Sequence, residues 1–400
     1  MNETGGTRVH GVSVFSGCEL EISIDGGAIS RVAELTPSGG RELPYVSPGF
    51  FDIQVNGYRG SDYSLDDLSD EHLDSIRRSL AASGTTQHIP TIVTSPRKRL
   101  LRNLEVMARA CESNSDLASA VPGIHIEGPF ISSEDGPRGA HDASYVRDPD
   151  YSEFAEWQAA SENRIRIVTL APERKGAIAF IERLSSEGVR VAIGHTAATP
   201  QQIRRTVQAG ASLSTHLGNG SHARIPRLDN YIWEQLAADE LRASIIGDGY
   251  HLPPAVLKVF SRAKGLSRLI LVSDAALLGG YDPGVYKWGN IDVEVFPDGH
   301  LGLPGTSMLA GAAHLLDWSI AHFHRYTGVP LGEAIRLCTE NPARYLGLTS
   351  VTSALRVGEP ANLTVFRYSG AGDRLQILET IVGGSVVYAA SAPTISEAKH

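Results

Sequence analysis

The chain alternates short apolar stretches with longer amphipathic ones, and this alternation constrains its fold more than any other feature. The apolar stretches are rich in valine, isoleucine and leucine without strict polar alternation, as is typical of strands buried on both faces. Eight strand candidates occur, at residues 46–54, 86–94, 121–127, 165–171, 189–195, 211–216, 243–248 and 269–274. Helical patterns lie between them, at residues 69–83, 96–111, 151–162, 175–187, 200–209, 231–241 and 253–264. This order predicts an α/β fold of the (β/α)8 or TIM-barrel type.

Both ends of the chain instead show short strand patterns separated by turns, at residues 9–15, 19–24, 29–35, 362–366, 375–381 and 384–388. Chain termini often lie close together, so we expect both ends to build one small β-sandwich. The predicted domains are therefore a catalytic barrel of residues 47–354 and a β-sandwich of residues 1–46 with 355–392. After the eighth strand candidate we expect a hairpin-like insert over residues 281–301, followed by helices over 309–326 and 330–346.

Composition and charge exclude several classes of partner. The net charge is −9, and no tract rich in lysine and arginine is present, which argues against nucleic acid. The three cysteines are far apart and form no Cys-x-x-Cys motif, which favours a reducing compartment. The first residues lack the pattern of a signal peptide, and no apolar stretch is long enough to span a bilayer. We expect a cytoplasmic protein with no nucleic-acid or membrane partner.

Groups that can bind a metal or move a proton stand at the ends of four predicted strands: Glu127, His195, His216 and Asp274. A single histidine at a strand end is more often structural, but four such ends in one barrel favour an active site. Two imidazoles and a carboxylate can hold one zinc-like ion and leave a position open for water. A further aspartate can take that water's proton. Asp274 could instead cap a helix, although its place at a strand end favours catalysis.

These motifs resemble those of the N-acetylglucosamine-6-phosphate deacetylases, a branch of the amidohydrolase superfamily. The similar stretches follow the family's order, at residues 48–57, 125–130, 139–141, 194–196, 215–217, 247–251, 272–275, 309–311 and 341–343. The resemblance implies a (β/α)8 barrel with a β-sandwich, assembled as a homodimer. It implies a divalent metal held by Glu127, His195 and His216, with Asp274 as catalytic acid and base. His141 or His195 would help to stabilise the oxyanion.

The end of the first barrel strand departs from many amidohydrolases, which carry His-x-His there and bind two metals. The corresponding residues here are Gln54 and Asn56. Amides are poor zinc ligands compared with imidazole, so we predict one metal ion per chain, zinc, with iron or manganese as alternatives. Gln54 and Asn56 would orient water, substrate or neighbouring side chains.

The resemblance also implies how an N-acetylated amino sugar would bind. The residues assigned to the sugar and its phosphate are His141, Asn219, Gly220, Arg227, His251, Leu309, Ala310 and Gly311. The loop over residues 218–230 departs from the family's usual pattern, so a different N-acetyl sugar or cyclitol, phosphorylated or not, is an alternative to N-acetylglucosamine 6-phosphate. Two further alternatives are hydrolysis of another amide and a barrel that binds a sugar phosphate without turnover.

Other histidines and aromatic residues have no assigned chemistry. We expect His88 in the core and His322 on the surface of a helix. Trp288, with Tyr281 and Tyr286, is a candidate for lining the mouth of the site.

Overall fold

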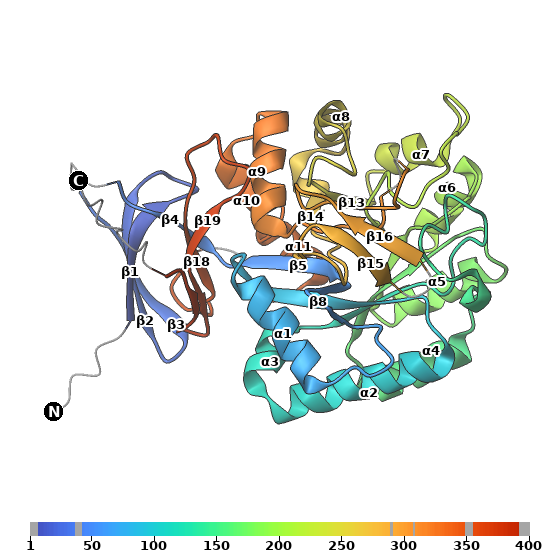
Figure 1. The fold of residues 1–400 in the computed structure, drawn as a ribbon, viewed down its shortest axis with the longest axis horizontal. Helices are drawn as coiled ribbons and strands as arrows, with labels where there is room; N and C mark the ends of the chain where they lie inside the picture. Colours follow the sequence, from blue (N-terminus) through green and yellow to red (C-terminus); the bar gives the residue numbers. More distant parts are fainter. Residues whose placement is uncertain (1–6, 37–41, 289–290, 307–308, 349–354, 392–400) are drawn as a thin grey trace.

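A computed structural model describes residues 7–36, 42–288, 291–306, 309–348 and 355–391. The parts of the predicted domains that fall on residues 1–6, 37–41, 289–290, 307–308, 349–354 and 392 lie outside the described residues. The described chain forms a barrel ringed by helices, with a smaller sheet built from both chain ends beside it (Figure 1).

The barrel is an eight-stranded sheet in which each strand is hydrogen-bonded in parallel to its neighbours, in sequence order. Its strands are β5 (Phe50–Val55), β8 (Thr85–Val93), β9 (Ile124–Glu127), β10 (Ile165–Leu170), β11 (Arg190–Ile193), β12 (Leu213–Ser214), β13 (Arg242–Ile246) and β14 (Leu269–Val272). Nearly all their residues are buried, since side chains fill the interior and helices cover the outside. The predicted (β/α)8 barrel is confirmed.

The barrel closes where β14 meets β5. The hydrogen bonds of this seam lie mainly beyond the last residue of β14. The backbone N–H of Asp274 donates to Gln54 O at 3.0 Å, and that of Asn56 donates to Ala275 O at 2.9 Å. Below them, the carboxylate of Asp52 accepts the backbone N–H of Ser273 at 3.2 Å. A side chain therefore supplies a link that strand pairing provides elsewhere. Burial raises the pKa of Asp52 to about 7.

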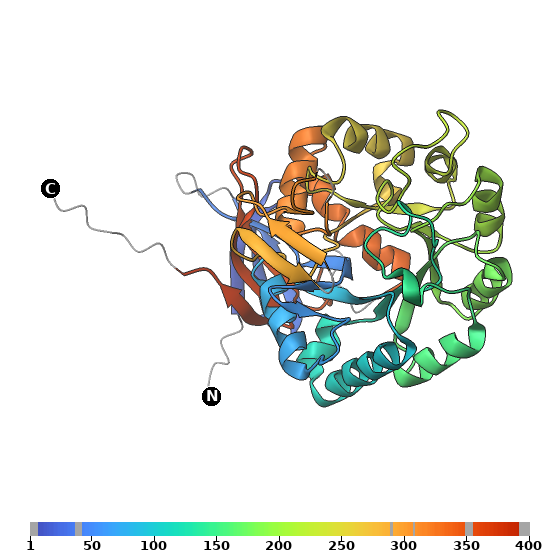
Figure 2. The same cartoon turned by 45° about the vertical axis from the view of Figure 1, so that its right-hand side comes forward.

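The helices surround the barrel, as Figure 2 shows. They are α1 (Asp70–Ala81), α2 (Arg97–Ser113), α3 (Ser115–Ala120), α4 (Tyr151–Ala160), α5 (Ala177–Ser186), α6 (Pro200–Gln208), α7 (Tyr231–Ala237), α8 (Pro254–Lys264), α9 (Leu316–Thr327), α10 (Leu331–Arg336) and α11 (Glu340–Leu346), with 3-10 turns η1 (Ala143–Tyr145) and η2 (Leu266–Arg268). The seven helices expected between the barrel strands are present near their predicted ranges. The start of α6 illustrates why, because Thr199 and Gln202 form a capping box immediately around Pro200.

Two helices predicted near the C-terminal end are present, but their predicted bounds were wrong. The one expected over residues 309–326 begins at Leu316, because Leu309 and Ala312 instead make β-bridges to Gly302 and Ala275. The helix expected over 330–346 is interrupted between α10 and α11. There the carbonyls of Leu337 and Cys338 accept backbone N–H groups of the barrel strands, at 3.0 and 2.7 Å, and so cannot continue a helical ladder.

The smaller sheet joins both ends of the chain in one hydrogen-bonded unit of seven strands, in the order β20-β19-β18-β4-β1-β2-β3. These are β1 (Thr7–Ser13), β2 (Glu19–Asp25), β3 (Ala28–Glu34), β4 (Tyr45–Pro48), β18 (Leu363–Arg367), β19 (Gln376–Val382) and β20 (Ser385–Ala389). Its halves enclose an apolar core that includes Ile22, Ile29, Leu363 and Ile381. The single strand predicted over residues 46–54 is thus two, since β4 belongs to this sheet and β5 to the barrel.

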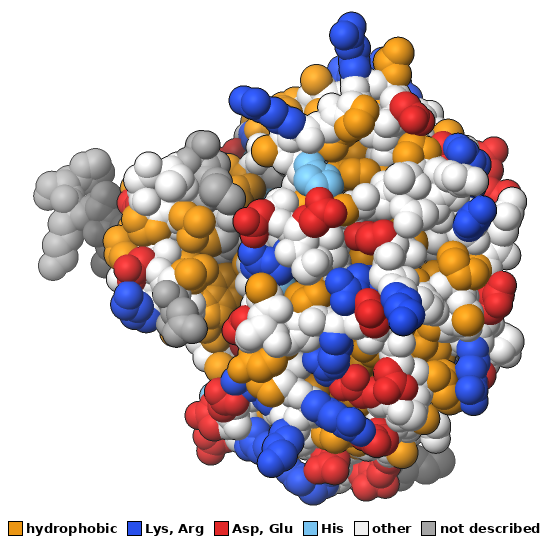
Figure 3. All heavy atoms as spheres, turned by 90° about the vertical axis from the view of Figure 1, so that its right-hand side faces the viewer, with side chains coloured by type: hydrophobic (Ala, Val, Ile, Leu, Met, Phe, Trp, Pro, Cys, Tyr) orange, Lys and Arg blue, Asp and Glu red, His pale blue; other side chains and the backbone are white. Residues whose placement is uncertain are grey.

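The insert after β14 is a three-stranded sheet of β15 (Gly284–Trp288), β16 (Ile291–Val295) and β17 (Leu301–Gly302), which confirms the predicted hairpin. A shorter pair, β6 (Gly57–Tyr58) and β7 (Ser61–Asp62), follows β5. In the part of the chain that the structure describes, no helix combines the length and the apolar character needed to cross a membrane. Figure 3 shows acidic and basic side chains intermixed on one face, without a stripe of one sign.

Candidate active site

A cavity of about 170 Å³ opens where the barrel strands end. It is lined by loops that follow several different strands and by the insert. Of the fourteen residues that the sequence assigns to the site, eleven line this cavity: Asn56, Glu127, His141, His195, His216, Asn219, Gly220, His251, Asp274, Leu309 and Gly311. The strand ends therefore converge as the barrel geometry requires.

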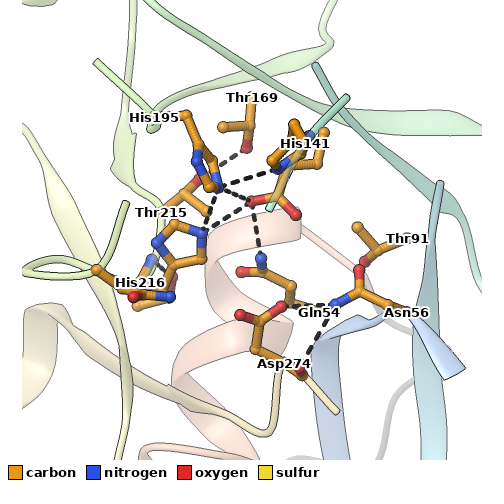
Figure 4. A network of polar contacts seen from close by, with 12 residues as sticks. Gln54, Asn56, Thr91, His141, Thr169, His195, Thr215, His216 and Asp274 are labelled. Atoms are coloured by element: carbon orange, nitrogen blue, oxygen red, sulfur yellow. Dashed lines mark hydrogen bonds and ion pairs between the residues drawn. The ribbon is translucent and has the colours of Figure 1, made fainter. Parts of the chain in front are cut away.

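Glu127, His195 and His216 form a compact triangle at the centre of the cavity. Oε1 of Glu127 lies 3.3 Å from Nε2 of His195 and 2.9 Å from Nε2 of His216, and the two Nε2 atoms are 3.1 Å apart. Ligands about 2.0–2.1 Å from a tetrahedral zinc ion lie roughly 3.3 Å from one another. The donor set and its spacing thus fit one divalent metal ion (Figure 4).

His141 lies on the other side of His195, with its Nε2 atom 3.2 Å from that of His195. It forms a second group with Glu127 and His195 whose ligand atoms all lie within 4.8 Å of one another. We favour the set containing His216, because His216 is within 3.1 Å of both other members. Burial lowers the pKa of His141 to about 3, so its ring is neutral. Its Nδ1 atom is 2.8 Å from the hydroxyl of Thr94.

The surroundings prepare these side chains for a cation. Nδ1 of His195 donates to the carbonyl of Pro137 at 2.9 Å, which leaves Nε2 free of a proton to bind a metal. Burial alone would raise the pKa of Glu127, but the adjacent imidazole groups of His195 and His216 hold it well below the usual range. Gln54 is buried beneath the cavity and donates its amide N–H to the same Glu127 oxygen at 3.0 Å. The amide therefore orients the carboxylate of this candidate metal ligand.

Asp274 stands beside this group at the seam of the barrel. Asn56 donates its amide N–H to Oδ1 of Asp274 at 2.8 Å, as Figure 4 shows. Burial raises the pKa of Asp274 to about 6, which suits a group that exchanges a proton near neutral pH. Oδ1 of Asn56 is buried without a hydrogen-bond partner among the described residues, so it is free to accept one from a ligand or water.

The backbone at three of these positions is left-handed. His195, His216 and Asp274 have φ angles of 51°, 29° and 51°, a region that residues other than glycine rarely adopt. In each case the chain turns sharply at or just past the end of a buried strand and aims the side chain into the cavity. Strain of this kind is typical of functional sites, where the surrounding fold maintains it.

Comparisons with known proteins agree with this geometry. The model of the amidohydrolase family matches residues 45–387. The chain is 31% identical over 377 residues to an N-acetylglucosamine-6-phosphate deacetylase of Bacillus subtilis, covering 92% of each chain, and 33% identical to the mouse deacetylase of the same name, covering 90% of this chain and 87% of that one. The chain belongs to the amidohydrolase family.

Solved structures point to the same branch of the amidohydrolases. The N-acetyl-D-glucosamine-6-phosphate deacetylase of Mycobacterium smegmatis, in complex with N-acetyl-D-glucosamine-6-phosphate, superposes with a TM-score of 0.82 at 29% identity, over 92% of this chain and 94% of that one. The Pasteurella multocida N-acetylglucosamine-6-phosphate deacetylase gives 0.83 at 27% identity, over 96% and 99%. The resemblance seen in the sequence motifs is confirmed.

Three of the assigned residues of this amidohydrolase do not line the cavity. Gln54 lies beneath it, and Ala310 is buried in the cluster of apolar side chains under the insert. Arg227 lies on the exposed loop over residues 221–230, where its carbonyl accepts from the indole of Trp233. Among the described residues that line the cavity there is no lysine or arginine. The assignment of Arg227 to substrate stays a prediction.

Two features of the site were not foreseen from the sequence. Asp248 is the partner of His251, with its Oδ2 atom 2.7 Å from Nδ1 of the imidazole. The three-residue spacing in a glycine-containing turn was the available signal. His322, expected on the surface, is buried and donates to the carbonyl of Asp248 at 3.0 Å, because its face of α9 packs against the turn that follows β13. The core position expected for His88 is confirmed, with Tyr63 as partner at 2.6 Å.

Proposed function

We propose that this protein hydrolyses the acetamide of N-acetylglucosamine 6-phosphate, releasing acetate and glucosamine 6-phosphate. The observation that carries the proposal is the meeting of Glu127, His195 and His216 with Asp274 inside one cavity. Relatives that cover about nine tenths of this chain bear the name of that activity.

The proposed cofactor is one divalent ion per chain, zinc, with iron and manganese as alternatives, held by Glu127, His195 and His216. When bound, it would polarise the acetamide carbonyl and acidify a water molecule. Gln54 and Asn56 offer amides where other amidohydrolases have imidazoles, which supports a single ion. In this arrangement Gln54 fixes the Glu127 carboxylate through its 3.0 Å hydrogen bond.

Asp274 is the proposed acid and base. Asn56 holds Oδ1 of Asp274, which leaves Oδ2 to take the proton of the attacking water and to return it to the departing amine. His141 is neutral because burial lowers its pKa to about 3, and its Nε2–H can donate to the carbonyl oxygen when Nδ1 accepts from Thr94. Its proposed role is oxyanion stabilisation.

The sugar and its phosphate are proposed to contact His251, the turn at Asn219 and Gly220, and the segment of Leu309, Ala310 and Gly311. A cation for the phosphate is proposed to come from Arg227 of a second copy in a homodimer. Two observations support this assembly: within one chain, no arginine or lysine of the described residues lines the cavity, and Leu228 beside Arg227 is 79% exposed.

We also propose a cytoplasmic location and a division of the chain into a barrel of residues 47–354 and a terminal domain of residues 1–46 and 355–392.

The test is acetate release by the purified, metal-replete protein. N-acetylglucosamine 6-phosphate should be hydrolysed much faster than N-acetylglucosamine, because only the former offers the phosphate. N-acetylgalactosamine 6-phosphate is the second candidate, since an Escherichia coli O157:H7 relative 30% identical over 346 residues is named for its deacetylation. Asp274→Asn should keep the metal and lose turnover by about 10²–10⁴-fold. Normal turnover in that variant, or no acetate from any of the three sugars, would refute the proposal.

A further inference from the structure

One aromatic ring of the insert reaches the cavity. Trp288, the last residue of β15, is the only tryptophan, tyrosine or phenylalanine among the described residues that line the cavity. Its side chain is half-buried, in contrast to Val285 on the same strand, which is 60% exposed. The alternation of strand side chains explains the difference, because Tyr286 and Trp288 face inward and Val285 and Lys287 face outward.

The ring is held in a defined place. Its inner side packs on the apolar cluster under the insert, which includes Ala276 and Ala310. Gly311 leaves room for it, since a Cβ atom there would lie only 3.3 Å from both Cζ3 and Cη2 of Trp288, and the φ of Gly311 is +86°. The same Cβ would lie 3.0 Å from Ala276, two residues after Asp274. The six-membered ring of the indole therefore lies next to the strand end that carries the proposed acid and base.

The cavity combines polar side chains with a small apolar wall. Glu127, His195, His216 and Asp274 are polar or charged, whereas Trp288, Ala276 and Leu309 are apolar. A pyranose ring presents C–H bonds on one of its faces, and these pack well on the electron-rich face of an indole. An acetamide directed at Asp274 would bring the attached sugar ring within reach of this wall.

We propose that Trp288 is a specificity-determining residue whose indole forms the platform on which the pyranose ring of the substrate packs. The inference rests on the proposed function and adds to it a requirement for a closed sugar ring. An open-chain compound with the same acetamide and phosphate would lack the flat C–H face and lose this contact.

The test measures binding in the Asp274→Asn background, where turnover does not interfere. The two ligands are N-acetylglucosamine 6-phosphate and its reduced open-chain alditol, titrated by calorimetry into the metal-replete protein. Trp288→Leu should weaken binding of the cyclic sugar about tenfold and leave that of the alditol nearly unchanged. Trp288→Phe should keep most of the affinity but lose the change in tryptophan fluorescence on binding. Val285→Ala, on the outward face of the same strand, is the matched control and should bind both ligands normally.

Equal weakening of both ligands in Trp288→Leu would show general damage to the cavity and overturn the inference, and so would unchanged affinity for the cyclic sugar. With Asp274 intact, Trp288→Leu should raise KM for the cyclic sugar and change kcat little. If the unaltered protein deacetylates the sugar but Trp288→Leu has the same KM, the inference alone fails. If the unaltered protein neither binds nor deacetylates it, the proposed function fails as well.

Discussion

The pair of Asp248 and His251 allows a quantitative prediction about stability. The side chains of Asp248 and His251 are 2% and 5% exposed, and their Oδ2 and Nδ1 atoms are 2.7 Å apart. Oδ1 of Asp248 also accepts the backbone N–H groups of Tyr250 and His251, at 2.9 and 3.0 Å. Burial alone would raise the pKa of Asp248, but the charge of His251 and these hydrogen bonds lower it from 3.8 to about 2.

This depressed pKa corresponds to stabilisation of the folded state by about 2 kcal/mol at neutral pH. Because the folded pKa lies below the unfolded one, the contribution is present above pH 4 and disappears as the pH falls through about 2. Asp248→Asn should therefore lower the free energy of unfolding by about 2 kcal/mol at pH 7, and the difference from the unaltered protein should shrink between pH 4 and pH 2. The change also removes the charge that orients His251 in the cavity wall, so KM for a phosphorylated sugar should rise.

The assay is urea unfolding of chelator-treated proteins, so that loss of metal in acid does not contribute. Asp298→Asn is the matched control, because Asp298 holds His300 at 2.6 Å but its side chain is 48% exposed. Solvent screens such a pair, and we expect a change below about 0.5 kcal/mol. The reasoning would be refuted by equal losses in the two variants, or by a loss in Asp248→Asn that is the same at pH 3 as at pH 7.

Three further predictions concern the metal, the barrel seam and a buried lysine. Chelation should abolish acetate release, and one equivalent of zinc per chain should restore it; two tightly bound equivalents by elemental analysis would contradict the roles given to Gln54 and Asn56. Burial raises the pKa of Asp52 to about 7. The contribution of the protonated Asp52 side chain to the stability of the folded state is therefore fully present below pH 4 and is lost as the pH rises through 7. Asp52→Asn should therefore gain stability relative to the unaltered protein between pH 5 and pH 8 in urea unfolding, and a constant difference would contradict this. Lys264 is fully buried and donates to the carbonyls of Gln235 and Ala238 at 2.7 and 2.6 Å. Lys264→Met should lower the free energy of unfolding by about 1–3 kcal/mol with kcat unchanged, and unaltered stability would contradict it.

The barrel could be predicted from the sequence because its signals are local. Buried parallel strands appear as apolar runs, and helix starts such as that at Pro200 carry their own capping residues. The helix ends near residues 309 and 337 could not be predicted, because they depend on distant backbone partners. The carbonyl of Leu337, for instance, is taken by the N–H of Leu271, 66 positions earlier.

The same distinction applies to the site. The sequence was enough to predict that four side chains meet, because a single rule places the ends of parallel strands on one face of the barrel. These side chains are Glu127, His195, His216 and Asp274. The burial of His322 depends on which side of α9 meets the turn after β13, and the pairing of Asp248 with His251 depends on the conformation of that turn. The exposed loop that carries Arg227 does not line the cavity of its own chain. The rule about strand ends therefore could not place Arg227 relative to the site.

The left-handed backbone at His195, His216 and Asp274 has an evolutionary consequence. Each such residue opposes folding by roughly 1–2 kcal/mol, and glycine at the same position would remove that penalty. Mutation without selection for activity would therefore move these three positions toward glycine or asparagine, and the barrel would become more stable as it lost its chemistry. A lineage no longer under selection for this activity would keep the fold and lose its reactive side chains first.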